Sequence, residues 1–372
     1  MIRNFVRVHQ EGSEQGVGQA FFPWQVGAIY DYPLDKGFGK GSHIVLVEFG
    51  GGVREGEIFA FIRQRYPQIN PLPVQYSNLG GASSVFNATD DACIECTLDL
   101  TVALAIAPEA QVTMIFAPNE QPYFVTALQR ALALNPTVIS ISWGMAEEFW
   151  DPNTIHQLEV VLTEIAGHGI PVLVSAGDQG AFDTTKGPAV NYPASSPNAI
   201  ACGGTSLTAE LRSPANSATG AFTQKVWDDN SLTNATGGGI SEVFTKPVFQ
   251  DTINIPGLPP KYPTNTRRGI PDISANADPE TGYILPYAGK QIVVGGTSAV
   301  APLYAGYFAL LKSIYPSWNM ANLLTILYTN QQAFLGVTQG SNGWWTAHPG
   351  WNACCGLGTL TYDNIAKIGG KS

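Results

Sequence analysis

The chain has 372 residues, of which only 13% are charged, and 29 acidic residues outnumber 19 basic ones to give a net charge of −10. This acidic balance excludes nucleic acid or an anionic membrane as the main partner. Hydrophobic residues make up 44% of the chain, enough for a sizeable core, and the 40 glycines and 26 prolines predict a folded protein with many loops. The five cysteines are too few for a disulfide scaffold.

Apolar runs alternate with helical patterns along most of the chain. The runs predict strands at 43–49, 111–117, 137–144, 171–177, 199–207 and 291–296. The helical patterns predict helices at 56–66, 91–107, 123–134, 152–169 and 298–315. Uniformly apolar strands that alternate with helices predict an α/β fold with a parallel sheet covered on both faces.

Two regions need separate interpretation. Residues 208–290 and 330–372 are rich in Gly, Pro, Asn, Ser and Thr, and we expect long surface loops and short hairpins there. Residues 292–311 carry no charge, but glycines and a proline interrupt them, so a buried strand and helix are expected rather than a membrane span.

A candidate nucleophile lies in the segment GGTSAVAP at 295–302. An apolar strand ends in two glycines and a helix follows, which places Ser298 at the amino end of that helix. Backbone N–H groups and the helix dipole favour a developing anion at such a position. A serine that simply caps the helix after a glycine turn is the alternative interpretation.

A nucleophilic serine needs a base, and histidine is the usual one. None of the five histidines occurs in a helix start of the H-G-T-H-V-A kind. The segment ECTLDL at 95–100 instead places Glu95 and Asp99 on one helix face among apolar residues. Two buried carboxyls this close are expected to share a proton, which raises one pKa and suits a base with its orienting partner. Two solvated acids on an exposed face are the alternative.

A third carboxyl follows the predicted strand at 171–177. The segment SAGDQG at 175–180 places Asp178 at the carboxyl end of that strand, where active sites of α/β folds lie. A protonated aspartate there can donate a hydrogen bond to an oxyanion in acid. Capping of the next turn is the alternative.

With these residues assembled, the chain resembles the sedolisin family of serine-carboxyl peptidases, and its kumamolisin-like branch in particular. The resemblance covers roughly residues 24–360 and implies a subtilisin-like fold, with a mostly seven-stranded parallel sheet, and acid-active cleavage of peptide bonds. The motifs that carry it are IVLVEFGGG (44–52), ECTLD (95–99), ISISWG (139–144), SAGDQG (175–180), YPASSP (192–197), ACGGTSL (201–207), GGGISEVF (237–244), RGIPDISANADPETGY (268–283), GGTSAVAPLYAG (295–306) and PGWNACCGLG (349–358).

The resemblance assigns roles by position. Ser298 corresponds to the family's nucleophile, and Glu95 corresponds to the general base. Asp99 corresponds to the carboxylate that orients this base. Asp178 corresponds to the aspartate of the oxyanion hole.

Five further positions follow from the same resemblance. Glu48 and Trp143 correspond to residues that extend the carboxylate chain, with the Trp143 N–H as its last donor. Ser142 and Gly144 flank Trp143 in the edge segment that pairs with a substrate backbone. Asn191 occupies a position beside the substrate groove that is often acidic in this branch, so a preference for basic substrate side chains is not expected.

The sequence departs from the family at its structural calcium site. The family's Asp-Ile pair is Gly336-Val337 here, and the aspartate of its G-W-D motif is Asn352. Calcium affinity follows the number of charged ligands, so we predict no calcium at this place and no other cofactor. The family also has a large prodomain. We expect residues 1–23 to be an N-terminal extension and 24–372 the catalytic domain, with no prodomain present.

These observations predict an acid-active serine-carboxyl endopeptidase that acts as a monomer on peptides or unfolded proteins. A catalytically weak or inactive peptide-binding relative is the alternative, and a histidine-dependent subtilase is a third. The expected location is extracellular for a processed mature domain and cytoplasmic if Met1 is the native start.

Overall fold

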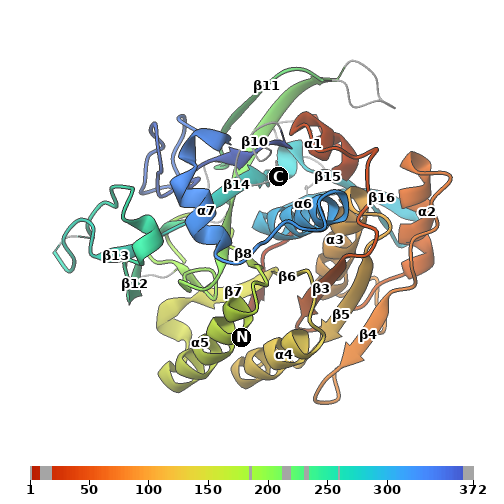
Figure 1. Ribbon diagram of the computed structural model, residues 1–372, viewed down its shortest axis with the longest axis horizontal. Helices are drawn as coiled ribbons and strands as arrows, with labels where there is room; N and C mark the ends of the chain where they lie inside the picture. Colours follow the sequence, from red (N-terminus) through yellow and green to blue (C-terminus); the bar gives the residue numbers. More distant parts are fainter. Residues whose placement is uncertain are drawn as a thin grey trace.

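An eight-stranded sheet forms the middle of the protein in the computed structural model, which describes residues 2–8, 19–183, 187–211, 219–229, 234–258 and 260–362. The strands run in the order β11-β10-β8-β6-β3-β5-β4, and β14 also pairs with β10 (Figure 1). Every pairing is parallel except that of β10 with β11, so seven strands are parallel, as expected, and β11 is an added antiparallel strand. The strands are β3 (His43–Glu48), β4 (Gln75–Asn78), β5 (Gln111–Phe116), β6 (Val138–Ile141), β8 (Val172–Ser175), β10 (Ile200–Leu211), β11 (Thr219–Val226) and β14 (Ile273–Asn276).

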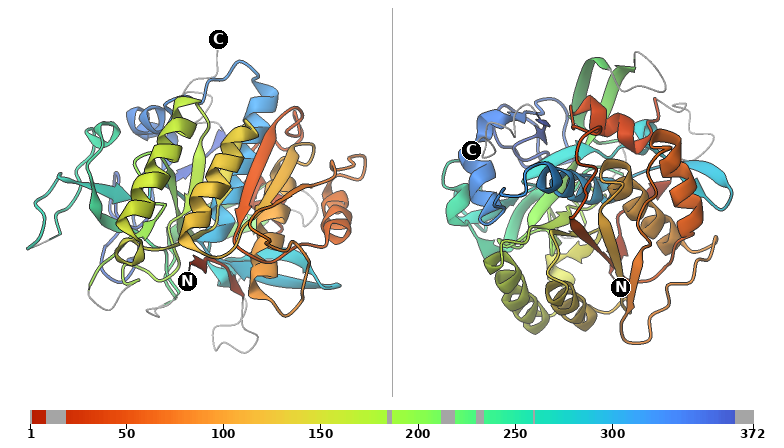
Figure 2. Two further views of the ribbon diagram at one scale, coloured as in Figure 1. Left: turned by 90° about the horizontal axis from the view of Figure 1, so that it is seen from below. Right: turned by 45° about the vertical axis from the view of Figure 1, so that its right-hand side comes forward.

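Helices cover both faces of this sheet (Figures 1 and 2). On one face lie α3 (Asp91–Ile106) and α6 (Val300–Ile314), and on the other lie α4 (Gln121–Ala133) and α5 (Pro152–Gly167). The remaining helices are α1 (Pro23–Ile29), α2 (Glu55–Arg65) and α7 (Leu323–Thr329). All five predicted helices are therefore present, each with ends within a few residues of the predicted ones.

Side chains of β3 point alternately to the two faces of the sheet, so this one apolar strand contributes to two hydrophobic clusters. Ile44 and Leu46 pack in the cluster that contains α3 and α6. Val45 and Val47 pack in the cluster that contains α4 and α5. Successive side chains of a strand point to opposite faces, so a run without polar positions is the pattern of a strand buried on both sides.

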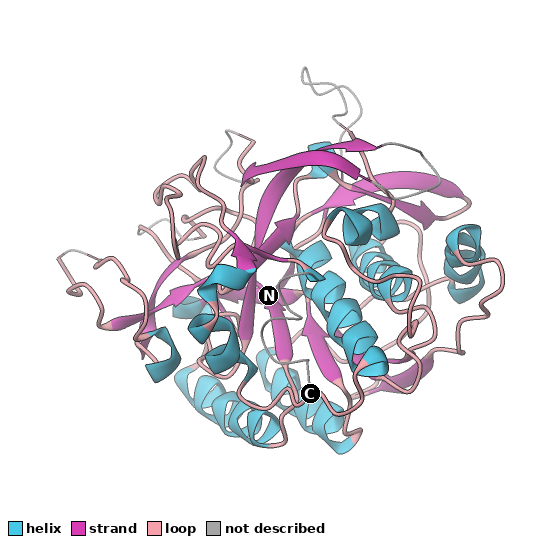
Figure 3. Ribbon diagram, turned by 45° about the horizontal axis from the view of Figure 1, so that its top comes forward, coloured by secondary structure: helices cyan, strands magenta, loops and turns pink. Residues whose placement is uncertain are grey.

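Short strands and turns surround the sheet (Figure 3). They include the pairs β12 (Gly239–Thr245) with β13 (Arg267–Ile270), β15 (Tyr283–Tyr287) with β16 (Lys290–Gly295), and β17 (Phe334–Leu335) with β18 (Thr359–Leu360). At one end of the sheet, β1 (Arg3–Asn4) joins β7 (Trp143–Ala146) and β9 (Asn191–Tyr192), and β2 (Arg7–Val8) joins β16. Figure 2 shows the N-terminus at this end of the sheet.

One expectation about the loops is wrong. Residues 273–276, predicted to lie in a surface loop, form β14, a buried strand of the central sheet. The strand is only four residues long and half polar. The polar side chain of Asn276 has a partner inside the fold, because its amide donates to the carbonyl of Thr281. A polar tetrapeptide of this kind carries no apolar run from which a strand could be predicted.

Two smaller expectations are also tested. In the part of the chain that the structure describes, no helix is long and apolar enough to cross a membrane. All five cysteines are buried free thiols, in line with a chain that has no disulfide scaffold.

Candidate active site

The predicted site residues converge at the carboxyl ends of three neighbouring strands. Glu48 is the last residue of β3, Ser142 follows β6, and Asp178 lies just beyond β8. Helix α3 packs against the 3₁₀ turn Thr297–Ala299, which precedes α6. This contact brings the carboxyls of α3 to the candidate nucleophile. The side chains assembled here are fully buried, and they are Glu48, Glu95, Asp99, Ser142, Asp178 and Ser298.

Glu95 lies beside Ser298 and is in an environment that favours its protonated form. Burial raises the pKa of Glu95 well above its usual value, and the hydroxyls of Ser298 and Ser142 offset part of this rise. Neither Glu95 oxygen has a hydrogen-bond partner of ordinary geometry among the described residues. Contacts of this kind often tighten only when substrate binds. The exposed-face alternative for Glu95 and Asp99 is excluded, because both are fully buried.

The second carboxyl of the pair has a partner that the sequence did not indicate. The Ser142 hydroxyl donates to Oδ1 of Asp99 at 2.9 Å. Burial raises the pKa of Asp99 well above its usual value, and the charges of Glu48 and Glu95 raise it further. Ser142 therefore holds Asp99 in place, in addition to its position in the edge segment.

The expected chain through Glu48 is only partly a chain of hydrogen bonds. The indole N–H of Trp143 donates to Oε2 of Glu48 at 3.0 Å. Burial raises the pKa of Glu48 to about 7, which the hydrogen bond from Trp143 partly offsets. Between Glu48 and Asp99 the structure has an electrostatic interaction, with no hydrogen bond of ordinary geometry among the described residues. Three buried carboxyls thus influence one another's protonation.

Asp178 presents one free oxygen toward the nucleophile's loop. Its Oδ1 accepts hydrogen bonds from the backbone N–H and the hydroxyl of Thr297, both at 2.8 Å. Its Oδ2 is buried and has no hydrogen-bond partner among the described residues. Burial raises the pKa of Asp178 to about 6, against the lowering effect of Arg7, whose Nε lies 3.9 Å from Oδ2. A proton on Asp178 therefore belongs on Oδ2, the oxygen left free.

A segment of the chain itself lies in front of these residues. Strand β1 pairs antiparallel with β7, with Arg3 opposite Gly144 and Asn4 opposite Trp143. The next carbonyl, that of Phe5, accepts a hydrogen bond from the backbone N–H of Ser298 at 3.2 Å. This is the edge at which a substrate backbone was expected to pair.

The segment continues beyond Ser298 and is held there as well. Arg7 pairs with Gly295 and Val8 with Val294 of β16. At the other end, the N–H and carbonyl of Ile2 bond to the side-chain amide of Asn119, at 3.1 and 3.0 Å. Residues 2–8 thus run through the groove as an extended strand.

The ring of Phe5 fills a pocket whose walls are two glycines. A β-carbon on Gly144 would lie 3.3 Å from the ring, and one on Gly177 would lie 3.8 Å from it. Phe5 is 2% exposed. Behind Gly177, the amide of Asn191 donates to the Ala176 carbonyl at 3.2 Å. Asn191 therefore helps to form this pocket.

The described histidines interact elsewhere. His43 contacts the Thr113 hydroxyl at 2.8 Å, and His168 contacts its own helix at the carbonyl of Glu164. His348 contacts the next carbonyl along the chain, and His156 is exposed on α5. No hydrogen bond joins any of these four to Ser298, so a carboxyl is the base that the geometry offers.

The residues at the family's calcium position do not fit a cation. The side-chain N–H groups of Asn352 donate to the carbonyls of Val337 and His348, at 3.0 and 3.1 Å. Its Oδ1 accepts from the backbone N–H groups of Cys354 and Cys355, at 3.2 and 3.0 Å. An amide proton of Asn352 thus occupies the carbonyl of Val337, which is itself at the family's calcium position. Within the described residues there is also no cluster of three His, Cys, Asp or Glu side chains suited to a metal ion.

Comparison with known proteins identifies the family of this chain. The model of the subtilase family matches residues 82–358. Kumamolisin from Bacillus sp. (strain MN-32) is 34% identical over 93% of this chain and 63% of its own length. The tripeptidyl-peptidase sed5 of Aspergillus fumigatus is 29% identical over 76% of this chain and 53% of its own length. The chain thus spans less than two thirds of the length of these relatives.

A solved structure supports the same assignment. Pseudomonas sedolisin, described as a serine-carboxyl proteinase complexed with two molecules of pseudo-iodotyrostatin, matches with a TM-score of 0.74 and 26% identity. The match covers 95% of this chain and 98% of that one. The match confirms the expected subtilisin-like fold. The chain belongs to the subtilase family and, within it, to the kumamolisin-like members of the sedolisin family of serine-carboxyl peptidases.

Proposed function

We propose that this protein is an acid-active endopeptidase that cleaves peptides or unfolded proteins through an acyl-enzyme on Ser298. One observation carries the proposal. The N–H of Ser298 donates to the Phe5 carbonyl oxygen, this oxygen and Oδ2 of Asp178 border the same space beside Gly296, and Glu95 lies beside the serine. This is the arrangement that acyl transfer requires.

Each group then has a defined task. Ser298 Oγ attacks the carbonyl carbon of the bound peptide and gives its proton to Glu95, which can accept it when the proton that the pair shares is on Asp99. The Ser298 N–H and protonated Asp178 donate to the oxyanion. Glu95 next passes the proton to the leaving amine, and water hydrolyses the ester in the reverse manner. Asp99, held by Ser142, orients Glu95 and retains the proton that the pair shares.

The length of the segment in the groove favours an endopeptidase over a tripeptidyl-peptidase. Counted from the carbonyl of Phe5, four residues precede the bond at Ser298, and the fourth, Ile2, is bound by Asn119. A tripeptidyl-peptidase needs a barrier after the third residue. The groove holds a longer chain here, and it continues beyond Ser298 to Val8.

We further propose that the fold needs no calcium, since Asn352 donates to the Val337 carbonyl and its own oxygen accepts from backbone N–H groups, so neither oxygen is left for a cation. The peptidase proposal is tested by cleavage of a denatured protein between pH 2 and pH 8, comparing the wild type with Ser298→Ala. Cleavage confined to acid and abolished by this substitution is the expected result. A folded protein that binds peptides without cleaving them at any pH would favour the peptide-binding alternative.

A further inference from the structure

We infer that Cys96 is a positioning residue of the active site, whose thiol donates a hydrogen bond to the carboxyl of Glu48 and holds that carboxyl beside Asp99. This inference rests on the proposed function, because it concerns how the carboxyls of the same site share protons. Its structural half can be tested without catalysis.

The thiol lies where the chain of hydrogen bonds through Glu48 is interrupted. The indole of Trp143 donates to Oε2 of Glu48, whereas Oε1 is buried and has no hydrogen-bond partner of ordinary geometry among the described residues. Cys96 precedes Asp99 by three residues in α3, so the two side chains share a face of the helix. Both of them interact with Glu48.

Cys96 also holds the backbone that follows Glu48. Its S–H group lies 3.3 Å from the Gly50 carbonyl oxygen, measured from Sγ, and donates to it. A β-carbon on Gly51, at φ 80°, would lie 2.8 Å from the same Sγ, so the turn approaches the thiol as closely as a glycine allows. The S–H group thus has two acceptors, the Gly50 carbonyl and the Glu48 carboxyl. The carboxyl is the stronger acceptor once it is ionised.

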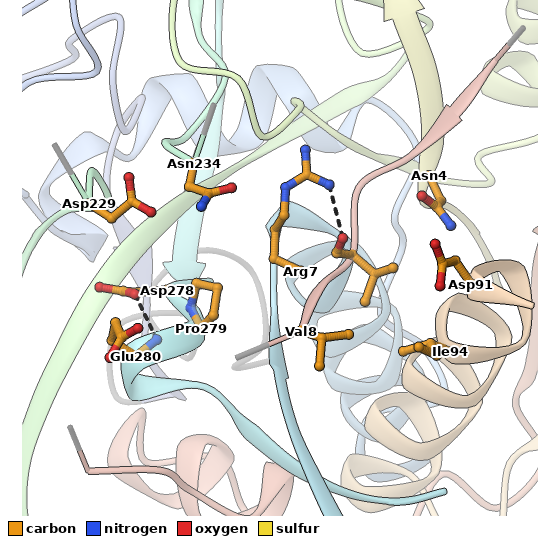
Figure 4. A pocket seen from close by; sticks show the side chains of 11 residues that line it. Asn4, Arg7, Val8, Asp91, Ile94, Asp229, Asn234, Asp278, Pro279 and Glu280 are labelled. Carbon is orange, nitrogen blue, oxygen red and sulfur yellow. Dashed lines mark hydrogen bonds between the residues drawn. The ribbon is translucent and has the colours of Figure 1, made fainter. Parts of the chain in front are cut away.

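The thiol is shielded from solvent. Figure 4 shows Asp91 and Ile94 of α3 along one side of an open pocket of about 480 Å³. Cys96 lies on another face of the helix, two residues beyond Ile94, and is 0% exposed. Burial raises the pKa of this thiol well above its usual value, and the charge of Glu48 raises it further. Cys96 therefore keeps its proton and remains a donor while the carboxyls titrate.

This donor affects which carboxyl is ionised. Burial raises the pKa of Glu48 to about 7, and the hydrogen bonds from Trp143 and Cys96 partly offset the rise. The other titratable groups that interact with Glu48 among the described residues are Glu95 and Asp99, both from α3, and the charge of Glu48 raises the pKa of each. The S–H of Cys96 therefore favours the ionised form of Glu48 and, through it, the proton that Glu95 and Asp99 share.

The first experiment follows the ionisation of Glu48 without catalysis. The indole N–H of Trp143 donates to that carboxyl, so its ¹⁵N shift reports the charge there. Labelled Ser298→Ala chains are titrated across neutral pH, and the signal is identified by its loss in Trp143→Phe. We expect a midpoint at about 7. Cys96→Ala should raise it by about half a pH unit, since a thiol is a weak donor, and Cys96→Ser, which keeps a donor, should not.

Cys93→Ala is the matched control. Cys93 lies three residues before Cys96 in α3, and its Sγ accepts the Asn87 N–H at 3.2 Å, but no hydrogen bond joins it to Glu48 among the described residues. Both alanine variants remove one buried thiol and should lower the Tm, yet only Cys96→Ala should move the midpoint. An unmoved midpoint in Cys96→Ala, or an equal rise in both alanine variants, would overturn the inference.

Hydrolysis by the enzyme with Ser298 intact gives a separate result. When Glu48 ionises less readily, Glu95 and Asp99 should lose their shared proton at a lower pH. Cys96→Ala should therefore lower the ratio of kcat at about pH 6 to kcat at about pH 4 by about two- to threefold, the size of half a pH unit. Cys96→Ser and Cys93→Ala should leave this ratio unchanged.

The two experiments separate the possible failures. A raised midpoint in Cys96→Ala, with no hydrolysis by the wild type at any pH, would overturn the proposed peptidase function and leave the bond from Cys96 to Glu48 standing. Hydrolysis confined to acid, with a midpoint that Cys96→Ala does not move, would overturn the role of Cys96 and leave the peptidase function standing.

Discussion

The backbone nitrogen of Ser298 lies 3.2 Å from the carbonyl oxygen of Phe5. A peptide carbonyl at this point can accept hydrogen bonds from two groups, the Ser298 N–H and the carboxyl of Asp178. The N–H can donate at any pH, whereas Asp178 can donate only when it carries a proton. The pH dependence of any reaction here should therefore depend on Asp178 as well as on the carboxyl pair of α3.

Asp178→Asn should retain activity and extend it above pH 6. The asparagine oxygen can keep accepting from Thr297, as Oδ1 does now, and the amide N–H can take the place of the proton on Oδ2. Asp178→Ala removes the donor and should lower kcat about 10²–10³-fold, as expected for an oxyanion-hole donor. Profiles of kcat against pH for both variants are the measurement. An asparagine variant as inactive as the alanine variant would contradict this role.

Substitutions at Glu95 and Asp99 should show that the first is the base and the second is the residue that positions it. Glu95→Gln should lower kcat by about 10³–10⁴-fold, near the upper range for loss of general acid–base catalysis. Asp99→Asn should cost less, about 10²-fold. This substitution should also shift the acidic limb of the profile of kcat against pH, because residue 99 no longer shares a proton with Glu95. A loss of activity without a shift of the pH profile would contradict the positioning role of Asp99.

The free energy of unfolding should fall as the pH rises from about 4 to 7. Burial raises the pKa of Asp178 from 3.8 to about 6, so the folded state binds more protons than the unfolded state in this range. A shift of this size corresponds to about 3 kcal/mol. The raised pKa of Glu48 acts in the same direction.

Urea titrations at several pH values measure this slope, in Ser298→Ala chains that cannot digest themselves. Adding Asp178→Asn should flatten it. Greater stability at pH 7 than at pH 4 would show that these carboxyls do not control the pH dependence.

Peptides with an aromatic residue before the cleaved bond should be preferred. The pocket between Gly144 and Gly177 holds the ring of Phe5, and Asn191 supplies no charge to it. Gly144→Ala should raise KM for both substrates, because the new methyl lies 2.9 Å from the Tyr192 carbonyl oxygen. The rise should be several-fold larger for a phenylalanine substrate than for an alanine substrate, because the methyl also lies 3.3 Å from the ring. Gly167→Ala, where a β-carbon meets nothing within 4 Å, is the matched control. An equal rise in KM for both substrates would show that the aromatic ring of the substrate does not bind between Gly144 and Gly177.

Removal of calcium should not change the melting temperature. Excess chelator should leave the Tm of the wild type unaltered, because Asn352 bonds to the groups that would bind the ion. Asn352→Ala loses four hydrogen bonds of a buried amide and should destabilise the protein by about 2–4 kcal/mol. Thermal melts with calcium and with chelator measure both effects. A drop of many degrees with chelator would reveal a surviving metal site.

The sequence by itself determined the α/β class, because the apolar runs of β3, β5, β6 and β8 are long enough to be recognised without structural information. It also indicated the chemistry of the site, since Ser298 follows a glycine turn and Glu95 and Asp99 are four residues apart on a helix. These signals are local, and they depend on spacing within one element. The four-residue strand β14 was missed because half of it is polar and its partners are distant in sequence.

Only the tertiary structure decided how residues from separate elements act on one another. The hydrogen bond from Ser142 to Asp99 joins positions 43 residues apart, and that from Ser298 to Phe5 joins positions 293 residues apart. The pKa of Asp178 depends on its burial and on Arg7. No local pattern encodes these contacts, because they arise when strand ends, a helix and an extended segment meet at one edge of the sheet.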